Sequence, residues 1–315
     1  MKRSKADPVH GWLVLDKPQG LTSTKALGIA RRLLNAQKAG HAGTLDPLAT
    51  GVLPLAFGEA TKTVPYLVEA TKTYRFTVQW GSETTTDDRE GETTRTSESR
   101  PTSDAIVRAL PAFIGDVVQT PPIYSALKVD GERAYDLARE GEEFELAPRQ
   151  TRIDRIELIE AGQDDAVLEM TCGKGTYVRA FARDLGRALA CLGHVKALCR
   201  LAVGPFSLQT AIPLEKLEES AKGGAAKRLL LPLATALDDI PALAVTDQEA
   251  TLLRQGQAIL ARGRVSTQEA VADDDAVSAP PVYCRSRSGD PIAITLFDRG
   301  ELRPVRVFKF SNSKG

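Results

Sequence analysis

The sequence predicts an α+β protein, because strands and helices are mixed along it without the regular strand–helix–strand rhythm of a doubly wound parallel fold. Apolar and polar residues alternate at 74–80, 151–159 and 166–172, which is typical of half-buried strands. Helical patterns occur after residue 22, at 103–114 and at about 177–190. An α+β sheet is therefore expected.

The first elements of the chain are a short buried strand at 14–15 and a turn at 17–20. A helix follows, with Thr22 or Ser23 as its N-cap. Its buried face is expected to consist of apolar residues at helical spacing, namely Leu27, Ala30, Leu33 and Leu34. Residues 41–47 show no such period, so a loop is predicted there.

The middle of the chain supplies two further helices. The helix at 103–114 ends before Pro121, because proline excludes the helical conformation from the residue that precedes it. The strand at 166–172 leads through the glycine-containing turn 173–175 into the helix at about 177–190.

The pattern changes around residues 232–241, and 315 residues fit two domains better than one. A short helix at 247–255 and glycine-bounded segments with the pattern of strands predict a small β-rich domain. Its residues 265–281 include an acidic run and are expected to form a solvated insertion. The expected domains are residues 9–240 and 241–312.

The composition is that of a globular protein with a core, since 42% of the residues are hydrophobic and 26% are charged. The longest apolar runs, such as residues 229–233, are far shorter than the roughly 18 to 20 residues of a membrane-spanning helix. The charged start at 1–10 and the short apolar stretch at 11–15 do not make a secretory signal. A cytoplasmic protein is therefore predicted.

The cysteines show no C-x-x-C pair and are expected to be reduced thiols. Cys191, His194 and Cys199 lie close in sequence, but their spacing matches none of the usual zinc patterns. The chain also has no H-E-x-x-H motif. We therefore expect neither a metal nor a cofactor.

Charge is unevenly distributed, although 41 basic and 41 acidic residues cancel. Residues 17–45 hold five bases and no acid, and residues 172–206 hold six bases against Asp184 alone. Residues 83–104 are acidic, and most of this segment, which is rich in Thr and Ser, is expected to form an exposed loop. The basic segments indicate either a surface for a polyanion or solvated helix faces whose acidic partners lie elsewhere in the fold.

The most unusual local chemistry lies in HAGTLDPLATG (41–51), where Asp46 stands among the apolar residues Leu45 and Leu48. A carboxylate in such surroundings needs a cation, and a buried arginine beside it would keep it charged and nucleophilic. The alternative is a plain Asp-Pro turn.

Other candidate residues each have a structural alternative. Tyr177 and Arg179 follow a strand-to-helix turn, where a guanidinium can bind phosphate or carboxylate, or can simply start a helix. Tyr74 heads a strand and either stacks on a planar substrate or packs in the core. A phosphate-binding P-loop is excluded, because Gly175 follows Lys174 where that motif has Ser or Thr.

Longer segments form an ordered set of motifs. They are LVLDKPQGLTS (13–23), GHAGTLDPLATGVLPLAFGEATK (40–62), KTYRF (72–76), Asp88 within GSETTTDDREG, PPIYSALKVDGERAYDLAR (121–139), CGKGTYVRAFARDLG (172–186) and ALCRLAVGPF (197–206). Together they resemble the TruB-type tRNA pseudouridine synthases, over roughly residues 9 to 310. The segment 40–62 resembles the catalytic motif of that family.

This resemblance implies isomerisation of the uridine at tRNA position 55, in the T arm, to pseudouridine. It implies a mixed, mainly antiparallel sheet flanked by helices and a C-terminal PUA-like RNA-binding domain. It makes Asp46 the catalytic aspartate, Arg179 the cation that pairs with it, and Tyr74 the ring that stacks on the uracil. The substrate-binding residues that it implies are Lys17, His41, Asp88, Lys128, Tyr177, Leu198 and Arg200.

The resemblance further implies that tRNA is the partner, that no cofactor or other protein is required, and that the chain is a monomer. Two features depart from the family: Cys199 stands where an arginine is common, and the insertion 265–281 is acidic. One alternative is an RNA-binding or RNA-folding protein that clamps tRNA without modifying it. Another is a guide-RNA-dependent relative, which the lack of long lysine-rich tails disfavours.

Overall fold

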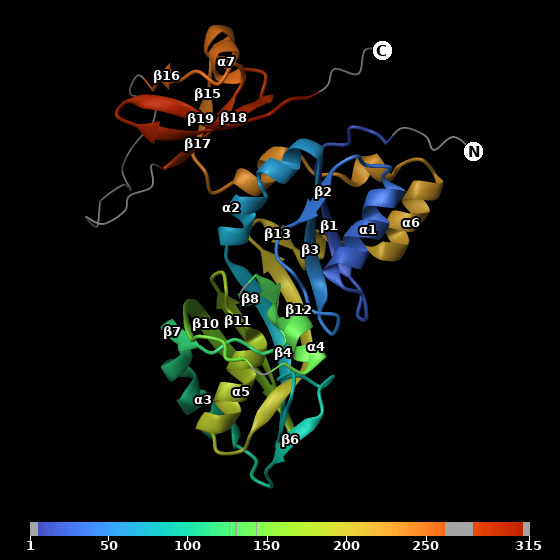
Figure 1. The fold of residues 1–315 in the computed structure, drawn as a ribbon, viewed down its shortest axis with the longest axis vertical. Helices are drawn as coiled ribbons and strands as arrows, with labels where there is room; N and C mark the ends of the chain where they lie inside the picture. The colour runs from blue at the N-terminus through green and yellow to red at the C-terminus, as the bar shows by residue number, and fades with distance from the viewer. Residues whose placement is uncertain (1–5, 126, 130, 143, 262–279, 311–315) are drawn as a thin grey trace.

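The computed structural model describes residues 6–125, 127–129, 131–142, 144–261 and 280–310. Its larger sheet has the strand order β14-β1-β3-β12-β4-β11-β10-β7, with β13 beside β12 and β2 beside β3 (Figure 1). In chain order these strands are β1 Gly11–Lys17, β2 Ala39–His41, β3 Thr50–Phe57, β4 Lys72–Trp80, β7 Gly115–Gln119, β10 Arg149–Ala161, β11 Asp165–Cys172, β12 Gly193–Val203, β13 Phe206–Ser207 and β14 Ile212–Pro213.

The pairs β1–β14 and β3–β12 are parallel, whereas β1–β3, β4–β12, β4–β11, β10–β11 and β7–β10 are antiparallel. The sheet is therefore mixed and mainly antiparallel, as expected. Two small hairpins accompany it, β5 Ser82–Thr84 with β6 Thr93–Thr96 and β8 Lys128–Val129 with β9 Glu132–Arg133.

The helices begin where local sequence signals place them. Thr22 is the N-cap of the first helix, since its hydroxyl accepts a hydrogen bond from the amide of Lys25 at 3.1 Å. The helices are α1 Ser23–Leu33, α2 Val64–Glu69, α3 Ser103–Ala109, α4 Ala134–Glu140, α5 Val178–Ala188, α6 Leu214–Lys222 and α7 Asp247–Arg254. Within the described residues, no helix is long and apolar enough to cross a membrane.

One predicted helix, at 103–114, is only partly α-helical. It becomes a 3₁₀ helix from Leu110 to Phe113. Pro111 lies at the start of this 3₁₀ segment, and its missing amide hydrogen cannot continue the α-helical bonds. His41 likewise ends strand β2 instead of opening the predicted loop.

Alternation along β1 and β3 divides the core between the two faces of the sheet. Leu13 and Leu53 point to the face that α1 and α5 cover, where a large cluster includes Phe76. Trp12 and Val52 point to the opposite face. Helices α1 and α5 therefore cover the same face of the sheet, and Ser23 of α1 and Arg179 of α5 both contact the loop that holds Asp46.

The C-terminal sheet has the order β15-β17-β18-β19-β16 and lies at one end of the molecule (Figure 1). Its strands are β15 Ala242–Ala244, β16 Ile259–Leu260, β17 Pro281–Arg285, β18 Pro291–Asp298 and β19 Glu301–Val307. Most of the predicted insertion 265–281 falls outside the described residues, and Pro281 begins β17. The fold class with a β-rich C-terminal part is thus confirmed.

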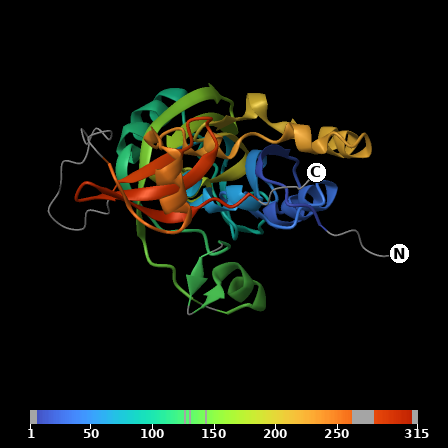
Figure 2. The ribbon, with the colours of Figure 1, turned by 90° about the horizontal axis from the view of Figure 1, so that it is seen from above.

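Contacts join this small sheet to the 3₁₀ helix Gly58–Lys62, which follows β3 directly. Lys62 Nζ donates to Val307 O at 2.7 Å, and the amide of Lys309 donates to Glu59 Oε2 at 2.6 Å. Tyr283 also packs in the cluster that contains Trp12. The segment with β8, β9 and α4 projects away from the larger sheet, as the green part of Figure 2 shows.

Candidate active site

The loop with Asp46 is held by the side chain of Ser23, the first residue of α1, and by the backbone of the turn before this helix. Ser23 Oγ accepts from the amide of Leu45 at 2.8 Å and donates to Leu45 O at 3.0 Å. The amide of Gly20 donates to Pro47 O at 2.8 Å. Leu45 and Leu48 are both buried, whereas the Asp46 side chain remains 36% exposed. The loop therefore fixes a carboxylate that solvent, or a substrate, can reach.

Arg179, in the first turn of α5, is the cation beside Asp46. Its Nε lies 2.9 Å from Asp46 Oδ2, and its side chain is only 6% exposed. Nη1 donates to Thr86 O and Nη2 donates to Tyr124 O, both at 2.9 Å. The guanidinium is thus fixed by two backbone carbonyls and presents its Nε to the carboxylate, an arrangement well suited to aiming it.

Asp88 is a second carboxylate near the same guanidinium. Its Oδ2 is 3.7 Å from Arg179 Nε, and its side chain is 6% exposed. Asp88 Oδ1 accepts from Thr86 Oγ1 at 2.6 Å and from the amide of Glu90 at 3.0 Å. Asp88 is therefore a buried carboxylate with a full set of partners beside Arg179, whereas Asp46 is the more exposed of the two.

Lys17 is fully buried and supports the Asp46 loop from below. Its ammonium donates to Pro18 O at 2.9 Å, to Leu21 O at 2.7 Å and to Pro47 O at 3.4 Å. Burial lowers the pKa of Lys17 to about 8, and the negative charge of Asp46 opposes that shift. The geometry favours a supporting role over contact with RNA.

Tyr74 lies on β4 opposite Arg200 of β12, and Phe76 lies opposite Leu198. Phe76 contacts a ring of α5, so these side chains belong to the face with Arg179. Tyr74 is partly buried, and its desolvation raises the pKa of the phenol, which the charge of Arg200 opposes. Leu198 is 8% exposed. Together they provide a planar and an apolar surface near the Asp46 loop.

Arg200 holds both ends of the Asp46 loop. Its Nε donates to Val52 O at 2.8 Å, Nη2 donates to Gly43 O at 3.1 Å and Nη1 donates to Thr44 O at 3.5 Å. The side chain is 1% exposed, so its donors are directed to the loop. That Arg200 also contacts RNA stays a prediction.

The remaining predicted site residues lie at the margins. His41 Nδ1 is buried with no hydrogen-bond partner among the described residues, and burial lowers the pKa of this ring, as does the charge of Arg200. Tyr177 is the N-cap of α5, and burial raises its pKa. Lys128 lies on β8, but its side chain is outside the described residues.

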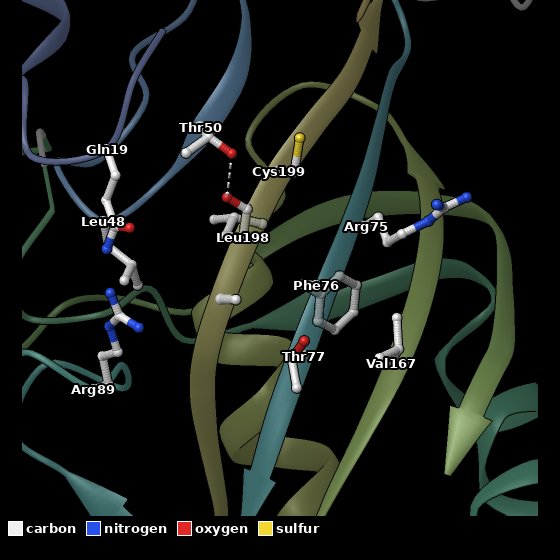
Figure 3. Close-up of a pocket in the computed structure, with 11 residues that line it drawn as sticks. Gln19, Leu48, Thr50, Arg75, Phe76, Thr77, Arg89, Val167, Leu198 and Cys199 are labelled. Atoms are coloured by element: carbon white, nitrogen blue, oxygen red, sulfur yellow. Dashed lines mark hydrogen bonds between the residues drawn. The ribbon is translucent and has the colours of Figure 1, made fainter. Parts of the chain in front are cut away.

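A pocket of about 350 Å³ lies between Leu48 of the Asp46 loop and the strands β4 and β12 (Figure 3). Leu48 and Leu198 line it on the side of the Asp46 loop, and Arg75, Thr77 and Cys199 line it on the strands. Thr50 closes its upper edge by donating to Leu198 O at 3.5 Å. The thiol of Cys199 thus faces this pocket, next to Arg75 on the neighbouring strand.

Metal ligation is not a feature of the described part of the chain, where no group of three or more His, Cys, Asp or Glu side chains could hold an ion. His194 Nδ1 is 3.0 Å from Ser82 O, and Cys191 Sγ contacts Gly186 O. The groups that the structure brings together around the Asp46 loop are a carboxylate, an arginine and an aromatic ring.

Comparison with known families decides the identity of this arrangement. The model of the TruB family pseudouridylate synthase N-terminal domain matches residues 31–178, and that of the tRNA pseudouridylate synthase B C-terminal domain matches residues 179–238. The chain belongs to the TruB family. It is therefore a pseudouridylate synthase, and the predictions of the family and of an isomerase are confirmed.

Relatives within the TruB family extend over nearly the whole chain. The tRNA pseudouridine synthase B of Caulobacter vibrioides is 56% identical over 98% of this chain and 99% of its own length. That of Bradyrhizobium diazoefficiens is 52% identical over 99% of this chain and 89% of its own length. The C-terminal sheet is thus included in the similarity.

Solved structures show the same fold at low sequence identity. An H/ACA ribonucleoprotein bound to a substrate RNA containing 2′-deoxyuridine includes a chain with a TM-score of 0.72 and 22% identity, covering 96% of this chain and 86% of that one. A Cbf5-Nop10-Gar1 complex includes one with a TM-score of 0.71 and 23% identity, covering 95% and 84%. Both support the pseudouridine synthase fold.

Sequence reasoning missed several groups that build the site. Ser23 carries the sequence signal of a helix cap alone, and Thr86 and Tyr124 contribute backbone carbonyls that carry no side-chain signal. Most of the acidic segment 83–104 is exposed, as predicted, but sequence reasoning did not identify Glu83, Asp87 and Asp88 as its buried members. Their arginine partners on α5, far along the chain, explain the difference.

Proposed function

We propose that this TruB-family enzyme isomerises uridine 55 in the T arm of tRNA to pseudouridine, as a cytoplasmic monomer that needs no metal, cofactor or protein partner. The observation that carries the proposal is the pairing of Asp46 with Arg179 at 2.9 Å on a loop where the carboxylate stays 36% exposed. The relatives from Caulobacter and Bradyrhizobium, which bear the name tRNA pseudouridine synthase B, support tRNA as the substrate.

The reaction is internally balanced. The N1–C1′ bond breaks and its electron pair remains on the uracil, which rotates while it is held. C5 then bonds to C1′, the proton leaves C5, and N1 gains a proton. Asp46 serves either by adding to C1′ or by taking the 2′ proton, and both routes are open. A carboxylate that attacks an anomeric carbon has a precedent in retaining glycosidases.

The surrounding residues have distinct tasks in this proposal. Arg179 aims Asp46, and Tyr74 stacks on the flipped uracil, because stacking holds a base while leaving it free to turn. Leu198, 8% exposed, supplies the apolar side of the base pocket. Lys17 and Arg200 keep the loop in place through backbone carbonyls.

The RNA surface extends beyond the base pocket. His41 would occupy the space that the opened T loop leaves, while Asp88, Lys128 and Tyr177 would line or brace the cleft. Residues 9–240 form the catalytic domain in this proposal. Residues 241–312 form the PUA-like domain that contacts another part of the tRNA, and phosphate contacts there would make binding salt-dependent.

Tritium release tests the proposal. A T-arm stem-loop with tritium at C5 of the target uridine is incubated with the full-length chain in EDTA, beside Asp46→Asn and the control Asp104→Asn, which alters an exposed acid of α3. We expect stoichiometric release by the wild type and by the control and none by Asp46→Asn, with RNA affinity unchanged. Tight binding without release from the wild type would favour the alternative of an RNA-binding protein.

A further inference from the structure

The face of α5 that carries Arg179 carries two further arginines. Arg179, Arg183 and Arg187 are four residues apart, so they lie on one side of the helix. Each faces a buried carboxylate on the segment that leads from β5 to the active site. The pairs are Arg179 with Asp88, Arg183 with Asp87 and Arg187 with Glu83.

Arg183, one helical turn further along α5, also joins a carboxylate to a backbone carbonyl, and its Nε donates to the neighbouring Asp184 Oδ1 at 2.9 Å. Its Nη1 lies 2.8 Å from Asp87 Oδ2, and its Nη2 donates to Thr120 O at 2.8 Å. These contacts join the turn that holds Asp87 to the segment that holds Thr120. The same turn and the same segment supply the backbone carbonyls that fix Arg179. Arg183 therefore sets the spacing between the two supports of Arg179.

Asp87 is an unfavourable residue for its position on stability grounds alone. Its φ is +58°, a left-handed conformation that favours glycine. The residue is buried, and desolvation raises the pKa of Asp87 to about 6 against the attraction of Arg183, Arg179 and Arg187 on the facing helix. Because this value lies above the ordinary 3.8, ionised Asp87 lowers stability at neutral pH.

We propose that Arg183 and Asp87 form a positioning clamp, which orients Arg179 and through it Asp46. The inference rests on the proposed function of the Asp46–Arg179 pair. Neither member of the clamp contacts Asp46 in the described contacts, so both are positioning residues. The clamp explains why a buried, ionisable side chain occupies a left-handed turn at which glycine would be less strained.

The third pair on the same helix face provides a matched control. Arg187 donates to both carboxylate oxygens of Glu83, from Nε at 2.6 Å and from Nη2 at 3.1 Å. Arg187 lowers the pKa of Glu83, so ionised Glu83 adds stability at neutral pH. This pair secures β5 to α5, whereas the Asp87 pair also reaches the segment behind Arg179.

The test compares Asp87→Asn, Arg183→Lys and Glu83→Gln in the full-length chain at pH 7.5. Single-turnover pseudouridine formation, RNA binding and urea unfolding are measured for each. We expect Asp87→Asn to lower the single-turnover rate about tenfold or more, because small misplacement of reacting groups is costly. RNA affinity should be unchanged, and the unfolding midpoint should not fall, because the amide removes a carboxylate whose ionisation costs stability at this pH. Glu83→Gln should lower the unfolding midpoint and keep the rate of the folded enzyme within about twofold.

Two further readouts distinguish positioning from general support. Arg183→Lys should give a rate between those of the wild type and Asp87→Asn. The lysine ammonium can reach the carboxylate of Asp87, but it cannot also donate to Thr120 O as the second guanidinium nitrogen of Arg183 does. The wild-type rate should fall as the pH drops through about 6, where Asp87 gains a proton, and Asp87→Asn should lack that component of the fall.

A wild-type rate for Asp87→Asn, or equal rate losses in Asp87→Asn and Glu83→Gln, would overturn the clamp. The proposed function would survive either result, provided that the wild type turns over and Asp46→Asn does not. If the wild type itself forms no pseudouridine, the proposed function and the clamp both fail.

Discussion

Replacing Arg179 by methionine is the most informative single change, because it removes the guanidinium and keeps much of the apolar volume. The change leaves Asp88, whose side chain is 6% exposed, without the cation that it faces at 3.7 Å. It also removes the donors to Thr86 O and Tyr124 O. Asp46 loses its partner too, but that carboxylate is more exposed and can be hydrated.

The size of the effect follows from these contacts. Removing one partner of a buried ion pair costs about 3–5 kcal/mol, mostly as the penalty of the unpaired charge. Exposed pairs contribute roughly 0–1 kcal/mol, so the Asp46 contact adds little to stability. We expect the free energy of unfolding to fall by about 4 kcal/mol, a large share of the roughly 5–15 kcal/mol that folded proteins have.

The assay is urea unfolding of Arg179→Met beside the double variant Arg179→Met/Asp88→Asn, with pseudouridine formation measured on both. A neutral amide at position 88 needs no cation, and its oxygen can still accept from Thr86 Oγ1 and the amide of Glu90. The double variant should therefore recover at least half of the lost stability, and turnover should stay lost in both. Equal stability of the two variants, or turnover restored by the second change, would refute this account of the site.

Two other variants test the supports of the loop. Lys17→Met tests how stability depends on pH. The pKa of Lys17 is about 8 in the folded chain and 10.5 in the unfolded chain, so the unfolded state binds more protons between these pH values. The free energy of unfolding of the wild type therefore rises with pH in this range. Urea unfolding at pH 7.5 and pH 10.5 should show a rise that is about 1–3 kcal/mol smaller in the variant, and an identical rise would contradict the burial of this ammonium. Arg200→Lys should lower the unfolding midpoint and reduce turnover at least tenfold, since lysine cannot reach Val52 O and Gly43 O together. Unchanged values in unfolding and single-turnover assays would show that the loop does not depend on those bonds.

Much of the fold could be predicted from local patterns, because apolar and polar residues alternate along a strand that has one buried face and one exposed face. Strand β4 and strand β11 show this alternation and form where it predicts strands, and they are neighbours in the sheet. The end of the helix that begins at Ser103 was harder to predict, because Pro111 is compatible either with the end of the helix or with a change to 3₁₀ geometry.

Only those features of the site that lie within one short sequence segment could be predicted from the sequence. The motif around Asp46 indicated a carboxylate that needs a cation, and Arg179 lies 2.9 Å from it. The pairing of Arg187 with Glu83 joins residues 104 positions apart, and charge alone cannot tell such a pair from two solvated faces. The basic segment 172–206 illustrates the ambiguity, since Arg179, Arg183 and Arg187 have the buried acidic partners Asp88, Asp87 and Glu83 elsewhere in the fold.

Strand β3 connects the Asp46 loop to the 3₁₀ helix that contacts the C-terminal sheet. The Asp46 loop enters it at Thr50, and the 3₁₀ helix that holds the C-terminal sheet leaves it after Phe57. Eight extended residues span about 25 Å, and a paired strand neither stretches nor bends easily. The length of β3 therefore fixes the distance between the Asp46 loop and the 3₁₀ helix that contacts the C-terminal sheet. An RNA that contacts both the loop and the C-terminal sheet must hold its target uridine about one strand length from its contact with that sheet.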